Sequence, residues 1–200
     1  MLRLDHLAVS CTTVAEGADW VQAVLGLPLV AGGKHPHMGT HNRLLRLGDL
    51  YLEVIAIDPG APAPAGPRWF DLDHFDGPPR LTNWVAACDD LDAVLAMAPA
   101  GAGRAVDLAR GDLRWRMAVP EDGRLPFDGA FPGLIQWQGI HPAQRLPDSG
   151  ARLLRLDLAH PDADALRAAL TGLDDARVVV TAGPVGLRAQ IDTPAGARWM

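Results

Sequence analysis

One succession of elements occurs twice along this chain, and it restricts the fold more than any other feature of the sequence. Residues 2–11 have the alternation of a strand, the stretch after them has an apolar face at helical spacing, and three more strand-like stretches reach residue 57. The same order begins again with LTNWVAAC at residue 81 and ends near residue 138. A repeat of this length predicts two copies of one βαβββ unit.

The repeat divides the chain into four parts. Residues 1–58 form the first βαβββ module and residues 81–145 form the second. Residues 59–80 are rich in proline and glycine, which predicts a linker or covering loop, and the aromatic side chains at its centre give it enough bulk to dock. Residues 146–200 repeat only part of the pattern and predict a C-terminal βαββ extension. The fold class that follows is α+β.

The charge balance of the chain argues against two classes of partner. Its formal net charge is −6 and its pI about 5.5, whereas nucleic acids and anionic membranes attract clustered Lys and Arg. No apolar run approaches the ~20 residues that span a bilayer, and the N-terminus lacks a signal-peptide pattern. Cys11 and Cys88 lack metal or redox spacing, so we expect two buried free thiols. We therefore expect a cytoplasmic protein whose partner is a small molecule.

Several stretches of the sequence together point to a known family. They are LDHLAVS at the start, GGKHPHMGTHN in the first module, and LTNWVAACDDLDAVL and GLIQWQGIHPAQ in the second. With them the chain resembles the glyoxalase-like domain family of the vicinal oxygen chelate (glyoxalase/bleomycin resistance/dioxygenase) superfamily. This resemblance implies an incomplete barrel around a cup, with helices on the convex side and a ligand in the cup. It also implies a divalent metal ion in the cup of many members, held by the first and last strands of each module.

The two modules, aligned on each other, give four candidate metal ligands. His6 of the first strand corresponds to Asn83, and Glu53 of the last strand corresponds to Gln136. Alternation along the strands predicts that these side chains face the cup while Trp137 faces the core. His and Glu can bind Zn, Mn, Ni, Fe or Mg, and amide oxygens can complete the shell. A second interpretation stays open, in which His6 and Glu53 hydrogen-bond to each other or to a ligand without metal.

A histidine-rich loop in the first module carries further candidate binding groups. His35, Thr40 and Asn42 fall within it, and in the resembled family this loop lies beside the cup. The proline and glycine between them indicate a shaped turn, so we interpret the three residues as ligand-contacting or loop-fixing groups rather than metal ligands. Tyr51, on the last strand of the module, is a further candidate for contact with the ligand.

The strand DLRWRMAV of the second module predicts two cationic groups in the cup. Leu113, Trp115 and Met117 share one face of this strand, and Arg114 and Arg116 share the other. If the apolar face packs on the helix, both guanidinium groups point into the cup, where they would bind a carboxylate, enolate or phosphate. The alternative is that the two arginines lie on a solvated strand face.

Two functions remain open at this point. In the first, His6 or a metal polarises a carbonyl of a small oxygenated metabolite and Glu53 moves a proton, which is isomerase, lyase or epimerase chemistry. In the second, the cup binds or sequesters a ligand without metal, as bleomycin-resistance proteins of the resembled superfamily do, with Tyr51, Trp69 and Phe70 as aromatic contacts. The sequence leaves the oligomeric state open between monomer and homodimer.

Overall fold

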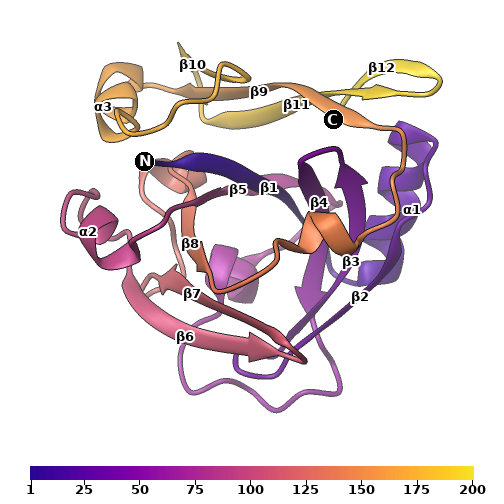
Figure 1. Ribbon diagram of the computed structural model, residues 1–200, viewed down its shortest axis with the longest axis horizontal. Coiled ribbons are helices and arrows are strands. Elements are labelled where there is room, and N and C mark those ends of the chain that lie inside the picture. The colour runs from indigo at the N-terminus through magenta and orange to yellow at the C-terminus, as the bar shows by residue number, and fades with distance from the viewer.

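Two β-sheets pack against each other in the computed structural model, which describes residues 1–200 (Figure 1). The larger sheet has eight strands. They are β1 (Arg3–Ser10), β2 (Val30–His35), β3 (Thr40–Leu47), β4 (Leu50–Ile57), β5 (Arg80–Ala87), β6 (Arg104–Arg110), β7 (Leu113–Val119) and β8 (Gly133–Trp137). The smaller sheet consists of β9 (Arg152–His160), β10 (Val178–Ala182), β11 (Gly186–Thr193) and β12 (Gly196–Trp199).

The larger sheet contains the duplicated module that the sequence predicts. Its strand order is β2-β3-β4-β1-β5-β8-β7-β6, so each half runs outward from its own first strand in the same way. Within the halves β1 pairs parallel with β4 and β5 pairs parallel with β8, and the two halves meet where β1 and β5 pair antiparallel. The sheet curls so that its edge strands β2 and β6 approach each other (Figure 1). The expected α+β fold, an incomplete barrel around a cup, is confirmed.

Short helices lie outside the barrel. α1 (Val14–Leu25) begins at Thr13, whose side chain accepts a hydrogen bond from the backbone of Glu16, and ends at Gly26, which has a left-handed φ of 72°. It packs its apolar face on β3 and β4. α2 (Leu91–Leu95) lies against the outer side of the second half and is capped by Asp90. None of the helices combines the length and apolar character that crossing a lipid bilayer requires.

The C-terminal residues cover the convex side of the half-barrel. β9 and β11 turn Leu153, Leu156 and Ile191 toward the larger sheet, where they join one hydrophobic core with residues of β1, β4 and β5. α3 (Ala163–Ala169) connects β9 to β10, which pairs parallel with β9. The expected βαββ extension is present with one strand more, because β12 adds to the edge of β11. Its strand order, β10-β9-β11-β12, differs from that of the two modules.

The proline-rich segment between the modules closes the concave side. It contains the 3-10 helix η1 (Trp69–His74), in which Trp69, Phe70 and Leu72 are buried. Phe70 and Asp71 have left-handed backbones, with φ of 60° and 53°, and the amide of Asp71 donates to the carbonyl of Gly123 at 2.9 Å. Two further 3-10 helices, η2 (Phe127–Gly129) and η3 (Pro142–Arg145), flank β8 along the chain. The aromatic side chains of η1 are thus held against the cup, as their bulk predicts.

Candidate functional site

A small cavity of about 30 Å³ lies on the concave side of the half-barrel. Its polar lining comes from His6, His35, Asn42, Glu53 and Arg110. The remaining lining is mostly apolar and aromatic. It consists of Leu44, Tyr51, Trp69, Phe70, Trp115, Met117, Ile135, Trp137 and Pro142. The cup is therefore an apolar chamber with one group of polar side chains.

A β-bulge on β1 brings two consecutive polar residues to the same side. Leu4 pairs with Ala86 and His6 pairs with the next residue, Val85, so Asp5 is an extra residue without a partner on β5. Leu4 packs in the core on the convex side, while Asp5 and His6 both reach the cup side. Strict alternation would have placed Leu4 and His6 on one face and Asp5 on the other.

His6 lies between two buried carboxylates. Its Nδ1 is 2.5 Å from Oδ1 of Asp5, and its Nε2 is 3.5 Å from Oε2 of Glu53. Glu53 comes from β4, where Tyr51, Glu53 and Ile55 alternate toward the cup as expected, and the ring of Tyr51 stacks on the imidazole at 4.4 Å. All of these side chains are less than a tenth exposed. The expectation that His6 and Glu53 face one cavity agrees with this geometry.

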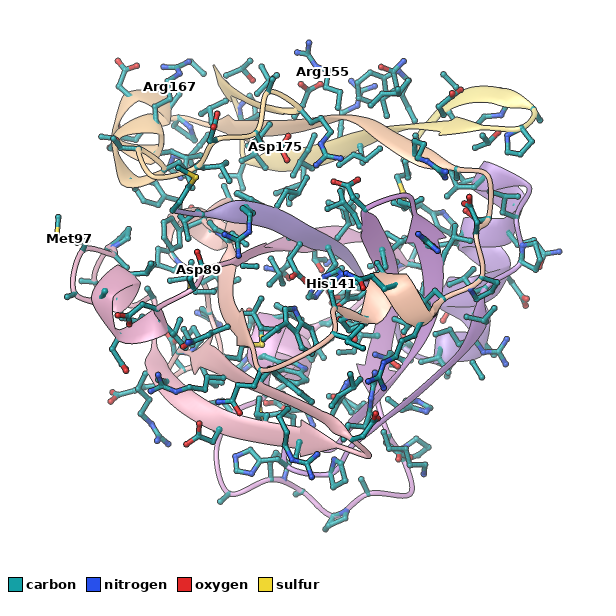
Figure 2. All side chains as sticks on the ribbon, in the orientation of Figure 1. Asp89, Met97, His141, Arg155, Arg167 and Asp175 are labelled. Atoms are coloured by element: carbon teal, nitrogen blue, oxygen red, sulfur yellow. The ribbon has the colours of Figure 1, made fainter.

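Asp5 is the centre of a second set of hydrogen bonds on the far side of His6. Its Oδ2 accepts from Nε1 of Trp137 at 2.9 Å and from Nε2 of His141 at 3.0 Å. Nδ1 of His141 accepts from the backbone of Ala143, which fixes the proton of this ring on the nitrogen that faces Asp5. Figure 2 shows His141 beside η3, next to the strands of the first module. The Asp5 carboxylate therefore has three donors and orients the imidazole of His6.

Burial and hydrogen bonding oppose each other in setting the protonation of this group. Burial alone would lower the pKa of His6, but its hydrogen bonds to Asp5 and Glu53 outweigh burial and raise the pKa to about 9. Burial would raise the pKa of Glu53, but the hydrogen bond and charge of His6 lower it to about 2. The pKa of Asp5 is likewise held well below its usual range by His141 and His6 against the effect of burial. At neutral pH the site is an imidazolium between two carboxylates.

The other oxygen of Glu53 connects to residues from the edge of the half-barrel. Oε1 of Glu53 accepts from Nδ2 of Asn42 at 2.5 Å, and Oδ1 of Asn42 accepts from the amide of Gly33 at 2.7 Å. Nη1 of Arg110, from the β6–β7 hairpin, reaches across to Nε2 of His35 at 3.1 Å and to Oδ1 of Asn42 at 3.4 Å. Arg110 thus joins the second half of the fold to the first.

His35 is neutral in this arrangement. A guanidinium can only donate, so Nε2 of His35 accepts from Arg110, and Nδ1 carries the proton and donates to Oγ1 of Thr40 at 3.1 Å. Burial lowers the pKa of His35 to about 4, with the charge of Arg110 acting in the same direction. Thr40 fixes His35 but does not line the cavity, whereas His35, Asn42 and Tyr51 do.

Three expected cup residues point out of the cup. Arg114 donates to the backbone carbonyl of Gly111 at 2.6 Å and is exposed. Arg116 forms an ion pair with Asp92 of α2 at 2.8 Å. Gln136 bonds to the backbone at the start of α2, donating to Asp89 at 2.8 Å. The predicted orientation of these side chains is wrong, because the second half turns apolar side chains inward.

The inward side chains of the second half are aromatic and aliphatic. Trp115 and Met117 of β7, and Ile135 and Trp137 of β8, line the cavity. The rings of Trp115 and Trp137 lie 5.5 Å apart. The expectation that Trp137 packs in the convex core is therefore also wrong. Nε1 of Trp69, on the opposite wall, is buried and has no hydrogen-bond partner.

The four candidate metal ligands do not converge. Asn83 lies on the concave face opposite Ala8, but it lines a different groove. Gln136 points outward, so only His6 and Glu53 remain, and the chain brings together no group of three His, Cys, Asp or Glu suited to a metal. The residues present do not fit a divalent metal ion.

Asp5, His141 and Arg110 are the site residues that sequence reasoning missed. The adjacent pair Asp5-His6 is visible in the sequence, but the bulge that turns both toward the cup is not. Arg110 directly precedes the glycine of a hairpin turn, where alternation gives no direction for the side chain. His141 follows β8 in a loop.

Comparisons with known proteins give a family and a fold. A family model described as a glyoxalase-like domain matches residues 4–173. No curated protein matches the sequence. Among solved structures, a hypothetical protein from Staphylococcus aureus is similar with a TM-score of 0.61 and 11% identity, over 92% of this chain and 88% of that chain.

Two solved methylmalonyl-CoA epimerases also match, with lower structural similarity. One is from Streptomyces coelicolor, in complex with 2-nitronate-propionyl-CoA, with a TM-score of 0.44 and 15% identity over 68% of this chain and 95% of that chain. The other is from Mycobacterium tuberculosis, with a TM-score of 0.45 and 16% identity over 72% of this chain and 91% of that chain. At this similarity neither epimerase supports a functional assignment.

Proposed function

The chain belongs to the glyoxalase-like domain family of the vicinal oxygen chelate superfamily, and on that premise we propose that its cup binds a small oxygenated anion on which His6 and Glu53 transfer a proton. The reaction class would be that of an isomerase, epimerase or lyase that begins with proton removal beside a carbonyl. The observation that carries the proposal is the buried pair of protonated His6 and ionised Glu53, 3.5 Å apart at the wall of a small cavity.

The two residues have complementary roles in such a reaction. The Nε2–H of His6 would donate to the carbonyl oxygen of the ligand and stabilise the negative charge that develops there. Glu53 would accept the proton from the neighbouring carbon. With its pKa at about 2, Glu53 is a weak base in the free protein because His6 stabilises its charge. A ligand oxygen that takes over the His6 N–H would remove this stabilisation and make Glu53 a stronger base where it is needed.

The presence of Arg110 in the cavity favours a negatively charged ligand. It is the only arginine that lines the cavity, and it forms no ion pair with a carboxylate. Its contacts with His35 and Asn42 are to neutral groups, so its charge is available to a carboxylate or phosphate. Arg110 would therefore take the role that the sequence assigned to Arg114 and Arg116.

The size of the cavity requires a wall to move. A volume of about 30 Å³ holds one or two water molecules, whereas ligand sites usually measure some hundreds of Å³. The η1 wall is suited to this movement, because Phe70 has a left-handed backbone that costs free energy and Nε1 of Trp69 lacks a partner. A ligand that accepts a hydrogen bond from Trp69 would offset that cost.

A second function is supported by the aromatic lining alone. Tyr51, Trp69, Phe70, Trp115 and Trp137 surround the cavity and would hold an apolar or flat ligand without any reaction. This is the metal-free binding or sequestering function, and it differs from the first in making no use of Glu53 as a base.

Deuterium exchange separates the two functions. Pyruvate, acetoacetate and 2-oxobutyrate serve as probes, and proton NMR in D2O follows exchange at the carbon beside the carbonyl. We expect protein-dependent exchange that is lost in Glu53→Gln and weakened in Arg110→Ala. Arg114→Ala is the matched control, because Arg114 lies near the same hairpin but outside the cup. Exchange that survives in Glu53→Gln would refute the proton transfer, and probes that bind without exchange would favour the binding function.

The metal-assisted form of the reaction has its own test. The protein is loaded in turn with Zn, Mn, Ni, Fe and Mg, and bound metal is measured by elemental analysis. The donor set predicts no stoichiometric metal. One equivalent of metal that disappears in His6→Ala would contradict the expectation that the protein binds no metal. It would support the metal site that the resemblance implies.

A further inference from the structure

A second and much larger hollow is lined by residues of the half-barrel and of the C-terminal sheet. This groove has a volume of about 860 Å³, which is in the range of small-molecule sites. Residues of α1, η1, β5, β11 and β12 and of the segment 124–129 line it. The cup, by contrast, has only about 30 Å³. The larger space is thus outside the cup, and the acid–base chemistry of His6 and Glu53 does not depend on it.

Asn83 presents to this groove an amide that has no partner in the protein. The residue is 5% exposed, and its side chain forms no hydrogen bond within the protein. Gly129, with φ of 88°, keeps the space beside it open, since a Cβ there would be 3.2 Å from Nδ2 of Asn83. An amide that has no partner in the protein can bond to a polar atom of a ligand in the groove.

Two arginines give the groove cationic groups that no carboxylate neutralises. Arg80 lies over the ring of Phe75 at 4.4 Å, and Arg188 lies over the ring of Trp199 at 4.6 Å. All four residues line the groove, and neither guanidinium forms an ion pair. Stacking holds each guanidinium in place. Nη1 of Arg80 donates to the backbone carbonyl of Asp76 at 2.7 Å, so the other N–H groups of Arg80 and the guanidinium of Arg188 are open to an anion. Trp199 is 40% exposed, so it also offers an open aromatic surface.

The carboxylates of the groove lie close to other side chains. Asp71 is 3.3 Å from Nε of Arg124 and 2.6 Å from Nδ1 of His74. Asp128 is 3.6 Å from Nε2 of His160. Of the three arginines in the groove, Arg124 is thus paired with Asp71, whereas Arg80 and Arg188 have no carboxylate partner.

Phe70 is the common wall of the groove and the cup. It lines both spaces, and it belongs to the segment with the left-handed backbone. A ligand in the groove therefore contacts the wall that closes the cup.

We propose that this groove is a second binding site, for an organic anion with a flat apolar body. Arg80 and Arg188 bind its charged group, Trp199 contacts its ring system, and Asn83 bonds to a polar atom of the ligand. The site stands independently of proton transfer in the cup, so either can fail without the other.

Two fluorescent probes of similar shape test this site. Anilinonaphthalenesulfonate has a flat apolar body and a negative charge, and N-phenylnaphthylamine has the same kind of body without the charge. We expect the wild-type protein to bind one equivalent of the anionic probe. The double variant Arg80→Gln/Arg188→Gln should bind it about tenfold more weakly, as expected for loss of a charged hydrogen bond, and should bind the neutral probe unchanged. Arg167→Gln is the control, because Arg167 is exposed on α3 outside the groove (Figure 2).

NMR of the tryptophan indole groups locates the probe. The anionic probe should shift the indole signal of Trp199 and leave that of Trp84, which is fully buried in the core, in place. Equal affinity of the double variant for the anionic probe, a parallel loss for both probes, or an unmoved Trp199 signal would each overturn the proposal. Binding that persists in Glu53→Gln while deuterium exchange is lost would support both this site and the proposed function of the cup.

Discussion

The carboxylate of Asp5 is the hydrogen-bond partner that contributes most to keeping His6 protonated, and its removal tests the description of the site. In Asp5→Asn the side chain keeps nearly the same shape but loses its charge. The amide cannot accept from His6, Trp137 and His141 together as the carboxylate does. Burial then opposes the imidazolium with only Glu53 in its favour, so we expect the pKa of His6 to fall from about 9 toward its ordinary value of 6.5.

The effect on stability follows from the difference between the folded and unfolded pKa. In the wild-type protein a rise from 6.5 to about 9 corresponds to roughly 3 kcal/mol in the free energy of unfolding. Because the folded pKa is the higher one, this contribution is complete below pH 6.5 and is lost as the pH rises to about 9. In Asp5→Asn that decline should be much smaller, so the two proteins should differ more at pH 6.5 than at pH 9.

Two measurements check this prediction. Urea unfolding across the interval from pH 6.5 to pH 9 gives the slope of stability against pH, and NMR titration of the His6 ring gives the pKa directly. Asp89→Asn is the matched control, since Asp89 is an exposed aspartate paired with Arg3 and should leave the slope unchanged. A His6 pKa that stays near 9 in Asp5→Asn would show that Asp5 does not hold the imidazolium, and the account of the site would be wrong.

Three further predictions concern the fold. Trp84→Phe removes a buried hydrogen bond of 2.9 Å from the indole nitrogen to a backbone carbonyl, so urea unfolding should show a loss of about 1–3 kcal/mol. Gly103→Ala should lower the thermal unfolding temperature, because the φ of Gly103 is 102° and the new Cβ would lie 2.3 Å from the backbone of Val119 at the end of β7. An unchanged unfolding temperature would contradict this geometry. Cys11 and Cys88 should react with a thiol reagent only after unfolding, since both are buried and burial raises the pKa of Cys11 to about 12; rapid reaction of the folded protein would refute this.

The fold could be read from the sequence because its signals are local and repeated. The apolar face of α1, its cap at Thr13 and its end at Gly26 each follow from neighbouring residues. The restart of the pattern at residue 81 then gives the second half of the sheet. The strand β12 was missed because its four residues carry no clear alternation, and they pair only at the edge of β11.

The sequence predicts correctly only those site residues that come from the first half of the duplicated sheet. On β4, alternation from Glu53 holds along the whole strand, so the inward direction was read correctly. On β1 the bulge at Asp5 reverses which face of the sheet the side chains before it point to, and no local feature of the sequence marks the bulge. On β7 the rule that apolar side chains pack against a helix gave the wrong face for Arg116, because both the cup and the core of this fold are apolar.

The unequal lining of the cup has a consequence for stereochemistry. The imidazole, the carboxylate and the amide come from the first half of the duplicated sheet, while Trp115 and Trp137 come from the second. A planar ligand between these walls would present one face to Glu53 and the other to aromatic rings that cannot exchange protons. Any carbon centre formed there would gain its hydrogen from a single side, so an isomerase or lyase reaction would give a product of one handedness although the sheet around it is a duplicate. An epimerase reaction would require the planar intermediate to turn over between the two walls.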